Sequence, residues 1–88
     1  MKVRLDIPGV DSLKEKRRII KSLLARIKNQ FNVSISEVAD NDVLRTATLG
    51  AAVVTNDTRF GHQVISKVVN RIEASPDVVV LDINTETY

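Results

Sequence analysis

The chain has 88 residues, of which 43% are apolar and 27% charged, with three glycines, two prolines and no cysteine. This length and composition predict one small globular domain, residues 1–88, because the chain is too short for a second core and too apolar for a disordered segment. The lack of cysteine excludes disulfides and thiol nucleophiles, and a single histidine argues against a histidine metal site. Charges near the N-terminus interrupt any signal-like apolar stretch, so we expect a cytoplasmic protein that does not enter the membrane.

The net charge of +2 is unevenly distributed along the chain. Residues 13–30 contain seven lysines and arginines and one acidic residue, a net charge of +6, so the remaining residues together carry −4. A charge asymmetry of this kind is typical of a protein that meets an anionic partner with one face. The acidic remainder would oppose indiscriminate coating by nucleic acid.

The first predicted elements are a strand and a long helix. Residues 2–7 alternate polar and apolar side chains and stop at Pro8-Gly9, which predicts a half-buried strand. Ser12 and Glu15 have the spacing of a capping box, so a helix is predicted to begin at Leu13. Apolar side chains recur on one side of this helix for about five turns. They are Leu13, Ile20, Leu23, Leu24, Ile27 and Phe31.

The rest of the chain predicts three more strands and a second helix. Period-two alternation indicates strands at residues 33–38 and 46–55, separated by turn residues at 40–42. A helix cap at residues 56–58 introduces an amphipathic helix that Ser75-Pro76 ends. The last strand, 78–83, is predicted to point Val79, Leu81 and Ile83 inward. The order βαββαβ is that of an α+β, ferredoxin-like sandwich: a four-stranded antiparallel sheet with two helices on one face.

The sheet face that the helices leave open is predicted to be small and neutral at its centre. Gly50, Ala52, Val78 and Val80 are expected to point outward there, a set that suits packing against a second copy of the chain. The alternative is a solvated, mildly apolar face. No aromatic residue is expected on this face, because both phenylalanines fall on predicted core faces, and base stacking on the sheet is therefore disfavoured.

The most informative candidate site is a row of cations on the long helix, which we call the basic stripe. It consists of Lys14, Arg17, Arg18, Lys21 and Lys28. On a helical projection these residues fall within an arc of about 100° beside the apolar side, with no acidic residue among them. Such a row suits contacts with the phosphates of a nucleic-acid backbone. The alternative is a solvated helix face made of good helix formers.

Other polar residues give weaker signals. Glu37, Asp40 and Asp42 could be considered as cation ligands, but they lack the ligand number and the glycine of a calcium loop, so turn capping is the preferred interpretation. Neither a dinucleotide-binding nor a phosphate-loop motif occurs. The sequence predicts no catalytic residue, metal site, cofactor or small-molecule substrate, and therefore a protein that is not an enzyme.

Two segments resemble the YlxP-like family, which comprises small bacterial proteins of unassigned function: SLKEKRRIIKSL at 12–23 and FNVSISEV at 31–38. Asp42, Arg45 and residues 48–50 also fit the family's pattern, although residues 42–45 hold aliphatic side chains where many relatives carry a tryptophan. The resemblance implies a ferredoxin-like fold. Members are commonly encoded beside translation and ribosome-maturation factors, which implies an association with RNA or the ribosome.

Together these observations predict a non-enzymatic domain that associates with RNA or the ribosome through its basic stripe and forms a homodimer through its open sheet face. The alternative is a protein-interaction or assembly module in which the same stripe meets an acidic protein surface. Salt-dependent binding of RNA separates the two hypotheses.

Overall fold

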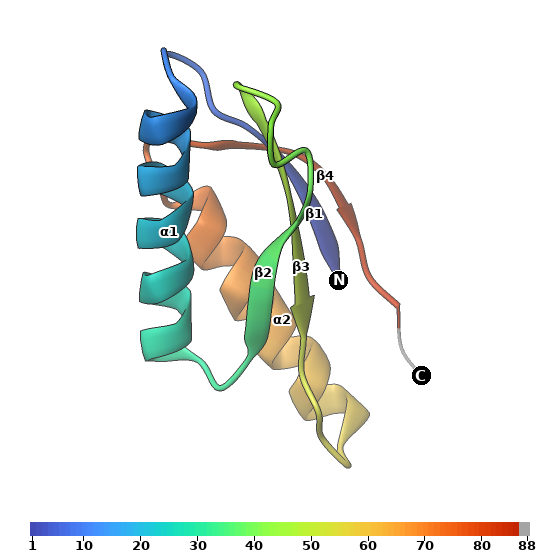
Figure 1. The fold of residues 1–88 in the computed structure, drawn as a ribbon. Coiled ribbons are helices and arrows are strands. Elements are labelled where there is room, and N and C mark those ends of the chain that lie inside the picture. Colours follow the sequence, from blue (N-terminus) through green and yellow to red (C-terminus); the bar gives the residue numbers. More distant parts are fainter. Residues whose placement is uncertain (87–88) are drawn as a thin grey trace.

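The structure is a computed structural model that describes residues 1–86. Its helices and strands follow one another in the predicted order. They are β1 (Lys2–Asp6), α1 (Leu13–Gln30), β2 (Ser34–Ala39), β3 (Thr46–Ala52), α2 (Thr58–Glu73) and β4 (Val79–Asn84). The strands form one antiparallel sheet in the order β2-β3-β1-β4, and α1 and α2 lie on one side of it (Figure 1). The predicted α+β, ferredoxin-like fold is confirmed.

Side-chain caps begin both helices. The Ser12 hydroxyl accepts a hydrogen bond from the Glu15 amide at 3.1 Å, so α1 begins at Leu13 as predicted. One carboxylate oxygen of Asp57 accepts from the amides of Arg59 and Phe60 at 3.0 and 3.2 Å, which starts α2. These contacts satisfy amides that a helix end would otherwise leave without partners.

The core lies between the sheet and the two helices. Val3, Leu5 and Ile7 are fully buried, as the alternation in the first strand predicts. Other fully or almost fully buried side chains come from α1, β3 and α2: Ile20, Leu23, Ile27, Ala47, Leu49, Val68 and Ile72. No helix among residues 1–86 has the length and apolarity needed to cross a bilayer.

The predicted inward orientation of the last strand holds at Ile83, which pairs with the buried Val3, and is wrong from the bulge back to the start of the strand. Val78 is only 6% exposed and Val80 packs against the core, whereas Val79, Leu81 and Ile83 are 51%, 52% and 41% exposed. The cause is an irregularity in the pairing with β1, which inserts one extra residue in β4 and brings Val80 opposite the buried Leu5. A simple alternation cannot continue through such a bulge.

The predicted dimer interface on the open sheet face therefore does not form one surface. Gly50 and Ala52 do lie on this face, because their pairing partners Lys2, Ser34 and Ser36 are solvent-facing. Val78 and Val80 lie on the core side instead. Four residues that a strict alternation would group are thus divided between the two sides of the sheet.

The first turns of α2 extend past the end of the sheet (Figure 1). Val68 and Ile72, in the second half of the helix, are its buried residues. Phe60 is 53% exposed, so the prediction that this side chain belongs to the core is wrong. Its position on the helical pattern is apolar, but the sheet does not reach far enough to cover it.

Candidate nucleic-acid interface

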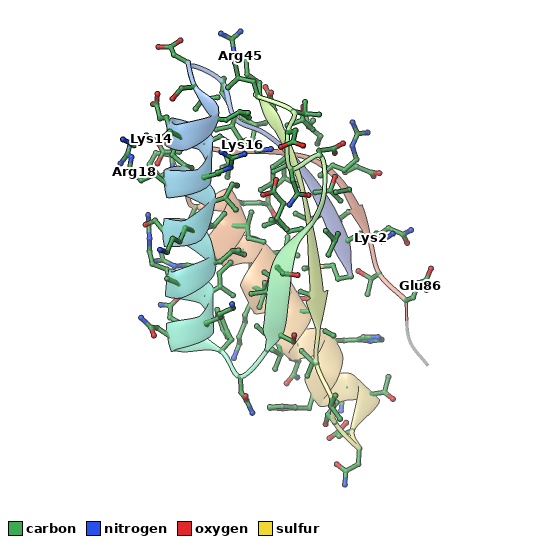
Figure 2. The ribbon with its side chains drawn as sticks, in the orientation of Figure 1. Lys2, Lys14, Lys16, Arg18, Arg45 and Glu86 are labelled. Atoms are coloured by element: carbon green, nitrogen blue, oxygen red, sulfur yellow. The ribbon has the colours of Figure 1, made fainter. Side chains whose placement is uncertain are left out.

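The five residues of the basic stripe are all solvent-exposed on α1. Lys14 and Arg18 point away from the sheet, whereas Lys16, on the same two turns of helix, points toward it (Figure 2). From Lys14 to Lys28 the stripe extends for about 21 Å along the helix at roughly 1.5 Å per residue. The structure therefore brings the predicted residues together on one exposed side of α1.

The stripe also borders a shallow groove between α1 and the edge strand β2. Arg17, Lys21 and Lys28 line this groove on the helix side, and Glu37 lines it on the strand side. Leu24 and Ala25, together with Ile20, supply its apolar part. The cations thus stand at the rim of a depression that is open to solvent.

Four stripe residues have no oxygen partner within residues 1–86: Lys14, Arg18, Lys21 and Lys28. The fifth, Arg17, approaches Asp42 with 3.6 Å between Nη2 and Oδ1. Both side chains are well exposed, so this pair contributes about 1 kcal/mol or less to stability. The sequence indicated no acid near the stripe, because Asp42 reaches α1 only through the folding of the β2–β3 loop.

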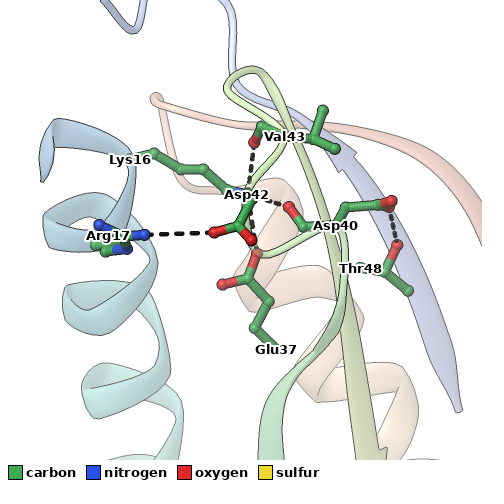
Figure 3. Close-up of polar contacts among 7 residues, drawn as sticks. All are labelled: Lys16, Arg17, Glu37, Asp40, Asp42, Val43 and Thr48. Carbon is green, nitrogen blue, oxygen red and sulfur yellow. Dashed lines mark hydrogen bonds and ion pairs between the residues drawn. The ribbon is translucent and has the colours of Figure 1, made fainter. Parts of the chain in front are cut away.

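Lys16 is separate from the stripe and forms a buried cluster that we call the Lys16 clamp. Its side chain is fully buried, and Nζ donates hydrogen bonds to the carbonyl oxygens of Asp40 and Val43 at 2.5 and 2.7 Å (Figure 3). The same Nζ lies 3.0 Å from Oε2 of Glu37, whose side chain is 13% exposed. That oxygen is buried and makes no hydrogen bond, so the lysine charge is the contact that compensates its burial.

The clamp holds the β2–β3 loop against the first half of α1. Asp40 adopts a left-handed backbone conformation with φ of 64°, which an aspartate tolerates better than most residues. Its carboxylate accepts a 2.7 Å hydrogen bond from the Thr48 hydroxyl. Because Lys16 holds two carbonyls of this loop, Asp42 is kept beside Arg17.

The three acidic residues of this region have structural partners. Glu37 pairs with Lys16, Asp40 bonds Thr48, and Asp42 faces Arg17. Within the described part of the chain, no three side chains of the metal-ligating types gather closely enough to hold an ion. The geometry at these residues is that of a turn tied to a helix.

The sequence pattern contained a signal for the clamp that the prediction did not use. Lys16, Ile20, Leu23 and Ile27 form one row along α1, with the spacing of four, three and four that marks a buried face. A lysine at the head of such a row is expected to be buried and to have an anionic or carbonyl partner. The identity of that partner depends on the sheet and could not be read from the helix.

The fold and the exposed stripe define a ferredoxin-like domain with one strongly basic helix face. Among residues 1–86 it has no cluster of side chains that could bind a metal ion. Residues 1–85 match the model of the DUF503 family, described as proteins of unknown function, and the chain belongs to this family. It is also similar to the uncharacterized protein YlxP of Bacillus subtilis (strain 168), with 36% identity over 67 residues, which are 76% of this chain and 73% of the relative. The resemblance to the YlxP-like family is thereby confirmed.

Proposed function

We propose that this protein is a non-enzymatic cytoplasmic domain that binds structured RNA, including RNA within the ribosome, through the basic stripe on α1. The observation that carries the proposal is the set of four exposed cations without an anionic partner in residues 1–86. Like charges in adjacent helical turns repel one another, and cations in the first turns oppose the helix dipole. An anionic partner removes both penalties.

The fate of the other cations on α1 supports this interpretation. Lys16 is neutralised by Glu37, and Arg26 donates a 3.0 Å hydrogen bond to the Ser22 hydroxyl on another side of the helix. The cations with internal partners thus lie mostly outside the stripe. What remains exposed and unpaired is collected in one arc that faces solvent.

The stripe has the chemistry of backbone contacts rather than base recognition. Sequence-specific binding of single-stranded RNA relies on aromatic rings that stack on bases. Within residues 1–86 the aromatic side chains are Phe31, which ends α1 and packs against the core, and Phe60 on α2. Neither lies on the outer face of α1 or on the open face of the sheet, so the proposed contacts are to phosphates and carry little sequence preference.

The test compares RNA binding by three proteins over a range of salt concentrations. In the stripe variant, Lys14, Arg18 and Lys21 are changed to Gln. In a charge-matched control, Lys2, Arg59 and Lys67 are changed to Gln, since these exposed cations lie on β1 and α2. The probe is a fluorescently labelled fragment of structured ribosomal RNA, and affinity is measured by anisotropy.

We expect the wild-type affinity to fall steeply with salt and the stripe variant to have a shallower dependence. Each lost phosphate contact should reduce the slope by about 0.7–0.9 log units of affinity per log unit of salt. The control variant should retain the wild-type slope, because its three cations lie elsewhere on the surface. Equal slopes for all three proteins, or no measurable RNA binding by the wild type, contradict the proposal. In the latter case an acidic protein surface becomes the better hypothesis for the partner.

A further inference from the structure

β4 is an edge strand with an unusually apolar exposed surface. It pairs with β1 on one side, and its other side is not hydrogen-bonded to any strand of residues 1–86. Three of its six residues are large aliphatic side chains that are about half exposed: Val79, Leu81 and Ile83. An edge of this kind offers free backbone groups and apolar side chains together, which favours pairing with another strand.

The bulge in β4 places these aliphatic side chains on both sides of the edge. Val79 pairs with the solvent-facing Asp6 and so lies toward the open sheet face. Ile83 pairs with the buried Val3 and lies toward the helices, yet it is 41% exposed. Leu81 is the extra residue of the bulge and is 52% exposed. The side chains of a strand paired along this edge would shield part of each of the three from water.

The distribution of charge decides which part of the surface can meet a second copy of the chain. α1 packs against β2 and α2 packs against β4, so the basic stripe lies near the edge of the sheet opposite to β4. The only charged residue of β4 is Asp82, whose cross-strand partner is Arg4. The β4 edge therefore carries little net charge, whereas contact through α1 or β2 would bring two basic stripes together.

We propose that the protein forms a two-fold dimer in which the β4 strands of two copies pair in antiparallel fashion and join the sheets into one of eight strands. In this arrangement seven strand spacings separate the outer β2 strands, about 34 Å at roughly 4.8 Å per spacing. This distance exceeds the Debye length of about 8 Å at physiological ionic strength, so the two stripes do not repel each other appreciably. The dimer uses the sheet edge, while Gly50 and Ala52 on the open face take no part.

The two-fold pairing is compatible with the side chains of the strand. If Val79 of one copy lies opposite Asp82 of the other, both residues point to the open face, and the two Asp82 carboxylates are offset along the strands rather than placed opposite each other. Like charges directly opposite one another destabilise a sheet, and this register avoids that arrangement. The inference is independent of RNA binding, since none of the stripe residues lies at the β4 edge.

The experiment is sedimentation equilibrium of the wild type and two lysine variants. Leu81→Lys places a charge at the proposed interface, and Ala52→Lys places the same charge on the exposed open face. We expect the wild type to dimerise at micromolar concentration and Ala52→Lys to match it. Leu81→Lys should raise the dimer dissociation constant by about tenfold or more. Circular dichroism of each variant checks that the fold is retained.

A wild type that remains monomeric at high micromolar concentration overturns the proposal. So does a dimer that Ala52→Lys dissociates and Leu81→Lys does not, because the interface would then be the open face. If Leu81→Lys fails to fold, amide hydrogen exchange of the wild type above and below the dimerisation range decides the matter. Slower exchange of β4 amides at the higher concentration supports strand pairing, and unchanged exchange refutes it.

Discussion

Replacing Lys16 with methionine tests whether the clamp stabilises the fold. Methionine keeps an unbranched apolar side chain as far as Cε but removes the ammonium group. The change leaves the Glu37 carboxylate, 13% exposed, without its counter-ion and removes the donor to the carbonyls of Asp40 and Val43. Breaking a buried ion pair by removing one partner costs about 3–5 kcal/mol, because the other charge remains buried.

For a domain of this size, each kcal/mol lowers the melting temperature by about 4–8 °C, so Lys16→Met should lower it by roughly 12 °C or more. Urea titration gives the free energy of unfolding directly. The matched control is Lys21→Met, the same chemical change at an exposed position of the same helix, which should alter stability by about 0.5 kcal/mol or less.

A double variant separates the ion pair from the loss of packing. With Lys16→Met and Glu37→Met combined, no buried charge is left alone, and a large part of the lost stability should return. If Lys16→Met lowers the free energy of unfolding by less than about 1 kcal/mol, the Lys16–Glu37 pair contributes no more than an ordinary surface ion pair, and the reasoning is refuted. A double variant no more stable than Lys16→Met would show that the orphaned carboxylate is not the main cost.

Three further predictions concern single contacts. Ser12→Ala removes the cap of α1 and should lower the free energy of unfolding, measured by urea titration, by about 0.5–2 kcal/mol. An unchanged free energy would mean that the cap does not contribute to stability. Gly50→Ala would place a Cβ 2.9 Å from Cγ1 of Val38 and should lower the free energy of unfolding by about 1 kcal/mol or more. If this clash is the cause, the double variant Gly50→Ala, Val38→Ala should recover the lost stability. Asp42→Asn removes the acid beside Arg17 and should strengthen binding of the ribosomal RNA fragment, measured by anisotropy; unchanged affinity would mean that Arg17 does not contact phosphate.

Local patterns were sufficient for most of the architecture. The alternation at residues 2–7, the cap at Ser12 and the periodicity of α1 depend on neighbours within a few residues, and these elements are where the sequence predicts them. The basic stripe belongs to the same class, since helical geometry alone places its residues in one exposed arc.

The errors and omissions lie where distant segments meet. The orientation of β4 depends on a bulge against β1, so Val78 and Val80 turn toward the core although alternation points them outward. The exposure of Phe60 depends on how far the sheet extends under α2, and the pairing of Arg17 with Asp42 depends on where the β2–β3 loop folds.

Lys16 shows how the two levels of information combine. The sequence alone places it in the same row of α1 as Ile20, Leu23 and Ile27, and the side chains of this row are buried. Only the packing of β2 and its loop against α1 supplied Glu37 and the two carbonyls that make burial of a charge tolerable. Helical periodicity is a local property of the chain, whereas compensation of a buried charge requires oxygen atoms that the tertiary structure brings from residues more than twenty positions away.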